Sequence, residues 1–276
     1  MIPQALRAKG FGDPETVRMG GRKFRRLMIG TEGFSNTGKT EFMLSAPGPG
    51  AVISVDRGFD AIFDNPKPPT ARREDFGFNV IQTPLASQST DPRFYAEHWN
   101  KFYTAYKEAL AIPEVRTIGI DCDSDTWELQ RLAEWGTLQG IVSLRYAGVN
   151  ASRRVLYARA WDSGKIVIAA NKLSKDYKPV YNTDGSPKLD SAGKQVREWD
   201  GKSYERQGFN DQDYLFSLQI RHLYREGKGG PEWGLVILKC KADPSVQGME
   251  LWGDDCNFAG LVQTCYPHIP LEEWGF

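Results

Sequence analysis

Residues 33–40 combine glycines, a lysine and a hydroxyl side chain in a spacing suited to binding a polyphosphate. They read Gly-Phe-Ser-Asn-Thr-Gly-Lys-Thr and fit the pattern G-x-x-x-x-G-K-[ST] at every fixed position. Gly33 and Gly38 let the backbone curl so that successive N–H groups point toward an anion. We expect Lys39 to reach the β- and γ-phosphates of ATP and the Thr40 hydroxyl to ligate Mg²⁺. The other residues that we expect at the nucleotide are Ser35, Asn36, Thr37 and Glu41.

Polar side chains at the ends of two later apolar strands could complete such a site. Residues 117–121 read Thr-Ile-Gly-Ile-Asp, and a carboxylate at a strand end can hold Mg²⁺ through water. Asp121 is the first choice for this metal-binding role and Asp123 the second, with a solvated acidic turn as the alternative. Asn171 follows the next apolar strand, where it could sense the γ-phosphate or simply end the strand.

Strands and helices alternate along the part of the chain that must position these groups. The expected strands cover 23–30, 51–55, 78–81, 115–120 and 165–170, and the expected helices cover 41–46, 126–138 and 152–161. Asp91 and Pro92 predict the start of a further helix, along which aromatic residues recur at helical spacing. This stripe could stack bases, but the periodicity favours packing on a sheet. The alternation predicts an α/β fold with a mainly parallel sheet flanked by helices.

The character of the chain changes after residue 171. Residues 172–212 are polar and contain turn signals, and an alternating strand from Phe216 to Arg221 follows. A turn at 227–230 and a return strand at 234–239 predict an antiparallel hairpin appended to the parallel core. We therefore expect an N-terminal arm (1–22), one domain (23–255, with 172–212 as an insert) and a C-terminal tail (256–276).

Composition narrows the class of protein. The chain has 276 residues with 40% hydrophobic and 25% charged residues, as is typical of globular proteins. No apolar run could cross a bilayer and no apolar signal segment begins the chain, so we expect no membrane contact and a cytoplasmic location. The formal net charge is +0, so any contact with nucleic acid needs a local basic patch. The four cysteines lack the paired spacing of structural zinc sites and are expected to be reduced thiols.

The order of these motifs resembles that of RecA-like ATPases. The phosphate loop at 33–40 is followed by Asp56 after the second strand, then by 118–121 and 166–171. The closing strand, 236–241, looks like the Lys-x-Lys strand of RecA. The length, the polar insert and the late hairpin look more like the short phage RecA-like proteins. Those are nucleotide-binding AAA-domain proteins associated with single-strand annealing and recombination, so a phage-encoded chain would act in the host cytoplasm.

The resemblance implies a RecA-like P-loop core that binds ATP with Mg²⁺. Lys39 and Asp121 would act on the phosphates and the metal. Lys239 and Lys241 match lysines that reach the ATP of a neighbouring subunit, which would make hydrolysis depend on a homo-oligomer, either filament or ring. The alternative is that both lysines merely face solvent on one side of a strand.

One departure from the family concerns the carboxylate that orients the attacking water. RecA-like enzymes place a Glu just after the second strand, whereas this chain reads Val-Asp-Arg-Gly-Phe-Asp at 55–60. Asp56, Asp60 or Glu41 could substitute for it; otherwise hydrolysis is slow. This departure supports an alternative function, a nucleotide-gated assembly or adaptor module with a protein partner. A small-molecule kinase is disfavoured because the chain shows no Arg-rich lid.

Single-stranded DNA is the partner that the resemblance implies, together with a recombination or replication protein. The mobile DNA-binding loops of RecA-like proteins correspond to 172–212, where cations alternate with aromatic residues, a composition that suits backbone contact and base stacking. Acidic residues largely offset these cations, so a plain solvent-exposed hairpin is the alternative. The cations expected at DNA are Lys175, Lys178, Lys188, Lys194, Arg197, Lys202 and Arg206.

Overall fold

The computed structural model describes residues 24–57, 59, 61–64, 71–191, 193–227 and 230–276. The arm predicted for 1–22 and the candidate carboxylate Asp60 lie outside the described residues. In chain order the elements are β1 (Leu27–Gly33), α3 (Lys39–Leu44), β2 (Gly50–Ser54), α4 (Ala61–Asp64), β3 (Phe76–Val80), α5 (Pro92–Ala111), β4 (Thr117–Asp121), α6 (Asp123–Trp135), α7 (Tyr146–Ser163), β5 (Ile166–Pro179), β6 (Arg197–Arg206), α8 (Gln212–Leu215), β7 (Leu218–Gly227), β8 (Gly230–Cys240), β9 (Glu250–Trp252), α9 (Phe258–Cys265) and α10 (Leu271–Trp274).

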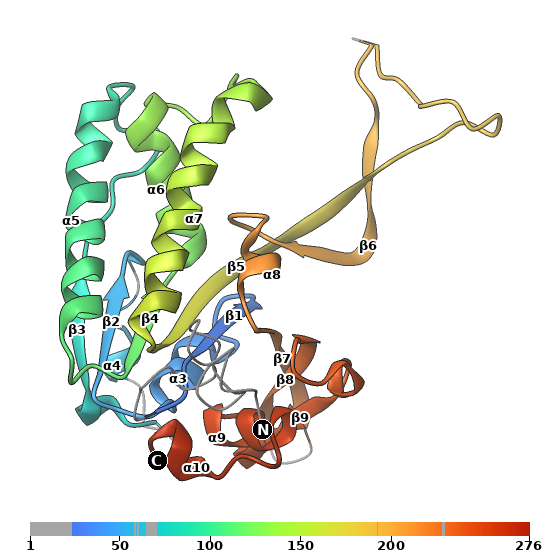
Figure 1. Ribbon diagram of the computed structural model, residues 1–276. Helices are drawn as coiled ribbons and strands as arrows, with labels where there is room; N and C mark the ends of the chain where they lie inside the picture. The colour runs from blue at the N-terminus through green and yellow to red at the C-terminus, as the bar shows by residue number, and fades with distance from the viewer. Residues whose placement is uncertain (1–23, 58, 60, 65–70, 192, 228–229) are drawn as a thin grey trace, which may run out of the picture.

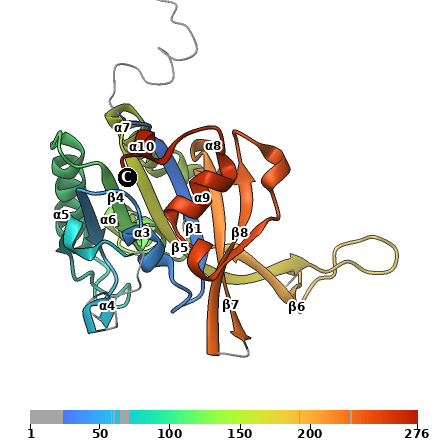
Figure 2. The same cartoon turned by 90° about the horizontal axis from the view of Figure 1, so that it is seen from below.

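The central sheet has the strand order β3-β2-β4-β5-β1-β7-β8-β9 (Figures 1 and 2). The strands from β3 to β7 pair in parallel, and β8 and β9 add on in antiparallel fashion. The predicted α/β fold is confirmed: it is a mainly parallel sheet flanked by helices, with an appended antiparallel hairpin. In a parallel sheet the carboxyl ends of the strands share one edge, so β1, β2 and β4 deliver their terminal residues to the same place.

Each face of the sheet buries its own set of side chains. Along β1, Leu27 and Ile29 point into a core that includes residues of α3, α9 and α10. Met28 points into the opposite core, which includes residues of α5 and α7. Successive side chains of a strand face opposite sides, so an unbroken apolar run is what a strand covered on both faces requires.

The aromatic stripe belongs to α5, which begins after the N-cap Asp91 and has Pro92 in its first turn. Tyr95, Phe102 and Tyr106 are fully buried. The Tyr106 hydroxyl donates to the Leu156 carbonyl at 3.0 Å, which ties α5 to α7. The interpretation of this stripe as a core-packing face is therefore confirmed for its inward-facing rings.

Two boundaries differ from those predicted. The strand expected to end before Asn171 continues as β5 to Pro179, because β6 pairs with its polar half in antiparallel fashion. The polar half of β5, β6 and the described residues between them project from the body (Figure 1), and we call this projection the arm. Residues beyond 255 contribute α9 and α10 to the core below β1, and Arg25 forms an ion pair of 2.6 Å with Glu273 of α10.

The described residues contain neither a helix that could span a membrane nor a cluster of metal-binding side chains. None of their helices combines the length and the apolar character that a membrane span needs. None of their His, Cys, Asp and Glu side chains form a cluster of three that could hold a metal, and all four cysteines are free thiols.

Candidate nucleotide-binding site

The phosphate-loop motif connects β1 to α3, as the spacing predicts. Gly38 has φ 89° and Asn36 has φ 60°, so two residues of the loop adopt the left-handed backbone conformation before the helix begins. The Lys39 ammonium donates to the carbonyl oxygens of Gly33 (3.1 Å) and Phe34 (2.5 Å), and the Thr37 hydroxyl also donates to Phe34 at 2.9 Å. The curled backbone and the amine are thus assembled on one loop, as anion binding requires.

Thr40 and Asp121 meet although 81 residues separate them. The Thr40 hydroxyl donates to Asp121 Oδ2 at 2.6 Å. Asp121 ends β4, and its register partners are Ser54 on β2 and Ala170 on β5, so parallel pairing carries it to the edge where β1 enters the loop. A hydroxyl beside a carboxylate is a pair of hard oxygen donors, which fits Mg²⁺ that keeps several of its waters.

Burial sets the electrostatics of this pair. It raises the pKa of Asp121, while the hydrogen bond from Thr40 acts in the opposite direction. Burial also lowers the pKa of Lys39, against the nearby negative charges that include Asp121 and Asp56. A desolvated amine beside desolvated carboxylates interacts strongly with any phosphate or cation that enters, because little water screens the charges.

A cleft of about 320 Å³ is lined by Asp56, Asp125, Glu128 and Lys172 but by no residue of the phosphate loop. The candidate carboxylate Asp56 follows β2 and is half-buried in this wall. Lys172 donates to both Asp125 oxygens at 2.7 Å. Sequence reasoning did not assign Asp125, Glu128 or Lys172 to the site. The signal was available for Asp125 and Lys172, because each lies within four residues of a strand end already singled out.

Glu41 contacts a cation on another element. Its Oε1 forms an ion pair of 2.5 Å with Arg73, which lies in a short 3₁₀ helix at Arg73–Asp75. Burial raises the pKa of Glu41, and Arg73 opposes that shift. The first turn of α3 is therefore fastened to the segment before β3, so the Glu41 carboxylate already has a partner away from the loop.

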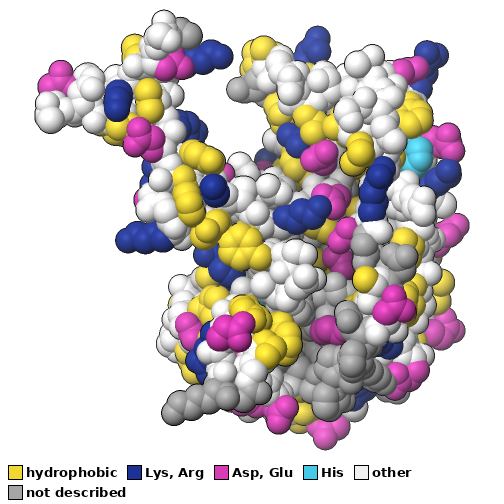
Figure 3. Space-filling view, turned by 180° about the vertical axis from the view of Figure 1, so that it is seen from behind, with side chains coloured by type: hydrophobic (Ala, Val, Ile, Leu, Met, Phe, Trp, Pro, Cys, Tyr) yellow, Lys and Arg dark blue, Asp and Glu magenta, His cyan; other side chains and the backbone are white. Residues whose placement is uncertain are grey.

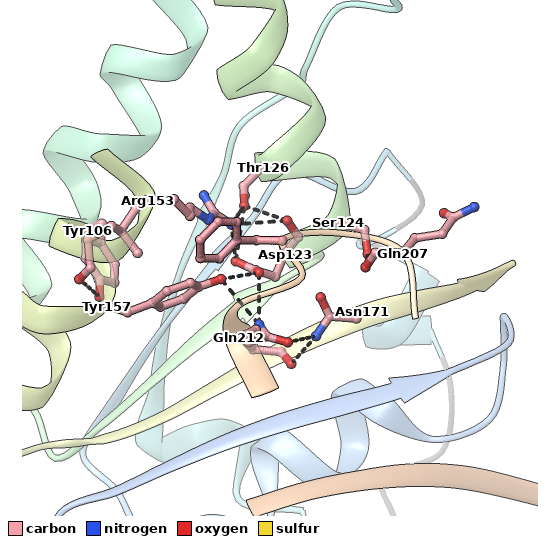
Figure 4. A network of polar contacts seen from close by, with 12 residues as sticks. Tyr106, Asp123, Ser124, Thr126, Arg153, Tyr157, Asn171, Gln207 and Gln212 are labelled. Atoms are coloured by element: carbon pink, nitrogen blue, oxygen red, sulfur yellow. Dashed lines mark hydrogen bonds and ion pairs between the residues drawn. The ribbon is translucent and has the colours of Figure 1, made fainter. Parts of the chain in front are cut away.

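Asp123, the second choice for the metal, lies in a buried polar network instead (Figure 4). Its side chain and that of Arg153 are both 0% exposed and form an ion pair of 2.5 Å. The Tyr157 hydroxyl donates to the other carboxylate oxygen at 2.5 Å. The interpretation of Asp123 as a metal ligand is wrong for this arrangement, because α6 begins at residue 123 and turns the carboxylate toward α7.

Asn171 and Arg206 belong to the same network. The Asn171 amide donates to Gln212 Oε1 at 3.0 Å and to the Thr31 carbonyl at 3.3 Å, and Gln212 in turn donates to Asp123. Arg206 donates to Gln212 and, with its side chain 8% exposed, forms an ion pair with Asp213. These contacts give Asn171 a structural role at the base of the arm, and burial removes Arg206 from the surface where we expected DNA.

Lys239 and Lys241 lie at the end of β8 that is remote from the hairpin turn. Lys239 pairs with Gln219, which pairs with Gly30 in the middle of β1. The strand register therefore places the lysines beside the middle of β1 and not beside the phosphate loop that follows it. Lys241 donates to the Tyr214 carbonyl at 2.6 Å, and Lys239 donates to the Phe216 carbonyl at 3.4 Å. Within one chain these lysines bind backbone oxygens around α8.

The remaining cations expected at DNA are on the arm. Lys175, Lys178, Lys188, Lys194, Arg197 and Lys202 are all exposed. The Lys178 ammonium lies 3.8 Å from Asp176 and 4.0 Å from Asp200, whereas Arg197 donates to the Tyr177 carbonyl. The arm therefore presents its cations to solvent, with acidic neighbours beside some of them.

Among known proteins, similarity to this chain is found in solved structures. No model of a known protein family matches the chain, and no curated protein matches it. Among solved structures, the crystal structure of the RadB recombinase is similar over 87% of this chain and 92% of that chain, with 13% sequence identity and a TM-score of 0.42.

Proposed function

We propose that this chain is a RecA-like ATPase that binds ATP with Mg²⁺, binds single-stranded DNA and assists annealing or recombination in phage DNA metabolism. The observation that carries the nucleotide part is the 2.6 Å hydrogen bond between Thr40 and Asp121. A chance match to the loop pattern would not bring a strand-end carboxylate to the last residue of the motif. That juxtaposition supports a working phosphate and metal site.

Each residue of the site has a distinct task in this proposal. The N–H groups of 35–40 surround the phosphates, Lys39 neutralises their charge, and Thr40 with Asp121 holds the metal. Mg²⁺ supplies further charge neutralisation at the β- and γ-phosphates when bound. Asp56 lines the cleft, and we assign it to orient water in preference to Glu41, because Glu41 is paired with Arg73.

Hydrolysis is proposed to require assembly and DNA. Lys239 and Lys241 lie level with the middle of β1 in their own chain, which supports contact with the nucleotide of a neighbouring subunit. DNA would track the exposed cations of the arm, whose projection leaves it accessible along its length (Figure 1). A recombination or replication protein is the proposed further partner.

A nucleotide-gated binding module with little turnover is the second candidate. The observation that favours it is the pairing of Glu41 with Arg73, which leaves the shorter Asp56 to act on water. Such a module would bind ATP tightly and use it to switch contact with a protein partner.

ATP hydrolysis with and without single-stranded DNA separates these candidates. The purified chain is assayed beside Lys39→Ala as the blank and Lys101→Ala, an exposed lysine of α5, as a surface control. We expect stimulation by DNA that Lys39→Ala abolishes, because the variant loses the charge on the phosphates. Nucleotide binding with no turnover under either condition would refute the ATPase and leave the gated module. Failure to bind nucleotide at all would refute both.

A further inference from the structure

Partly exposed aromatic rings lie against the phosphate loop. Phe34, the second residue of the loop motif, is 45% exposed and meets Tyr204 of the arm edge-on, with ring centroids 4.7 Å apart. Tyr204 in turn lies 5.5 Å from Trp199 on the same strand. The arm and the loop thus share one aromatic surface.

A second pair of rings contacts the same loop. Trp233 of β8 donates from Nε1 to the Asn36 carbonyl at 3.2 Å, and its ring lies 6.2 Å from that of Tyr224 on β7. Trp233 is 44% exposed and Tyr224 49% exposed. Two hairpins from different parts of the fold therefore place aromatic side chains against Phe34 and Asn36 of one short loop.

Cations accompany these rings. The Lys175 ammonium lies 4.5 Å from the centre of the Trp199 ring. Arg221 donates to the Tyr204 carbonyl and forms an ion pair of 2.6 Å with Glu32, the residue before the loop motif. Figure 3 shows hydrophobic side chains along the arm and on the body below it, with Lys and Arg side chains among them. Rings flanked by cations suit a ligand that alternates flat bases with phosphates, whereas the core of a protein interface is depleted of charge.

We propose that Phe34, Trp199, Tyr204, Tyr224 and Trp233 form a base-stacking track for single-stranded nucleic acid that crosses the phosphate loop. The track rests on the proposed nucleic-acid function, and it extends base stacking from the aromatic residues of the arm to rings of the phosphate loop and of the β7–β8 hairpin. The Phe34 carbonyl accepts hydrogen bonds from Lys39 and from Thr37. A base stacked on the Phe34 ring would therefore contact the same residue whose backbone binds the groups proposed to hold the nucleotide. Nucleic acid and nucleotide then influence each other's affinity reciprocally.

The test measures binding of a fluorescein-labelled oligothymidylate by anisotropy at several salt concentrations. Phe34→Leu and Trp233→Leu should each weaken binding about 5- to 100-fold, the range for loss of one base–aromatic stack. The slope of affinity against salt should stay unchanged, because stacking releases no counterions. Tyr214→Leu is the matched control: Tyr214 is 81% exposed on α8 and makes none of the ring contacts of the track, so the variant should bind within twofold of the wild type.

A second readout does not depend on large changes in affinity. Unlabelled oligothymidylate should quench the fluorescence of the wild type, and Trp233→Phe should retain binding but lose part of that quenching. Wild-type binding that Phe34→Leu and Trp233→Leu leave within twofold would overturn the track alone. No binding by the wild type would overturn the nucleic-acid function and the track with it. Loss of affinity for a fluorescent ATP analogue in Trp233→Leu, with oligothymidylate binding unchanged, would show that the ring stacks on the nucleotide instead.

Discussion

Asp121 and Asp123 lie two residues apart, but their replacement by asparagine should affect different properties. Asp123→Asn should lower the stability of the fold, whereas Asp121→Asn should weaken ATP binding in the presence of Mg²⁺. Asp123→Asn leaves the Arg153 guanidinium, which is 0% exposed, without its carboxylate. Removing one partner of a buried ion pair costs about 3–5 kcal/mol of unfolding free energy. Tyr157 and Gln212 also lose the charged acceptor to which they donate. We expect the midpoint of thermal unfolding to fall by about 10 °C.

Asp121→Asn should change stability by less than about 1 kcal/mol, because asparagine keeps an oxygen that can accept from Thr40. Burial raises the pKa of Asp121, which means that the ionised carboxylate is disfavoured where it lies. A neutral side chain of the same shape removes that cost. The affinity for ATP in the presence of Mg²⁺ should instead fall by about 10- to 100-fold, as for other groups that hold a metal through water.

Urea unfolding followed by tryptophan fluorescence measures the first effect, and titration with a fluorescent ATP analogue in Mg²⁺ or in EDTA measures the second. The double variant Asp123→Asn/Arg153→Met should recover part of the lost stability, because it also removes the unpaired cation. The assignments are refuted if Asp123→Asn abolishes the Mg²⁺ dependence at unchanged stability while Asp121→Asn unfolds the protein.

Two further predictions concern stability. Gly136→Ala should cost on the order of 2 kcal/mol in urea unfolding, because Gly136 has φ 70° and an added Cβ would meet the Thr90 carbonyl oxygen; an unchanged midpoint would contradict this. Burial lowers the pKa of His222 to about 3, with the charge on Lys39 acting in the same direction. Below pH 6.5 the unfolded chain therefore binds a proton that the native chain does not, so stability falls as the pH falls toward 3. Relative to His222→Gln, the wild type should lose about 1 kcal/mol between pH 6.5 and 5.5, and parallel pH profiles would refute that.

Sequence patterns predicted the fold and named part of the candidate site. The loop motif, the alternating strands and helices, and the N-cap at Asp91 are local signals, because each depends on residues within one or two turns of the chain. Asp121 could be singled out since a carboxylate after an apolar strand falls at the carboxyl edge of a parallel sheet. The same reasoning could not separate Asp121 from Asp123, because their difference is the direction in which α6 turns the second side chain.

Residues that contact one another across the fold carried no such local signal. In the sequence, Asn171 is a candidate γ-phosphate sensor or strand-end residue and Arg206 a candidate DNA contact. In the structure β5 continues past 171, and both side chains hydrogen-bond to the buried Gln212. The aromatic residues of 172–212 could be noted in the sequence, but their meeting with the loop could not, because Phe34, Tyr204 and Trp233 come from a loop and two separate hairpins. Backbone propensity and hydrophobic period act over a few residues and specify elements and their order. Which side chains meet at the edge of the sheet depends on strand register and helix direction, and those result from packing the whole chain at once.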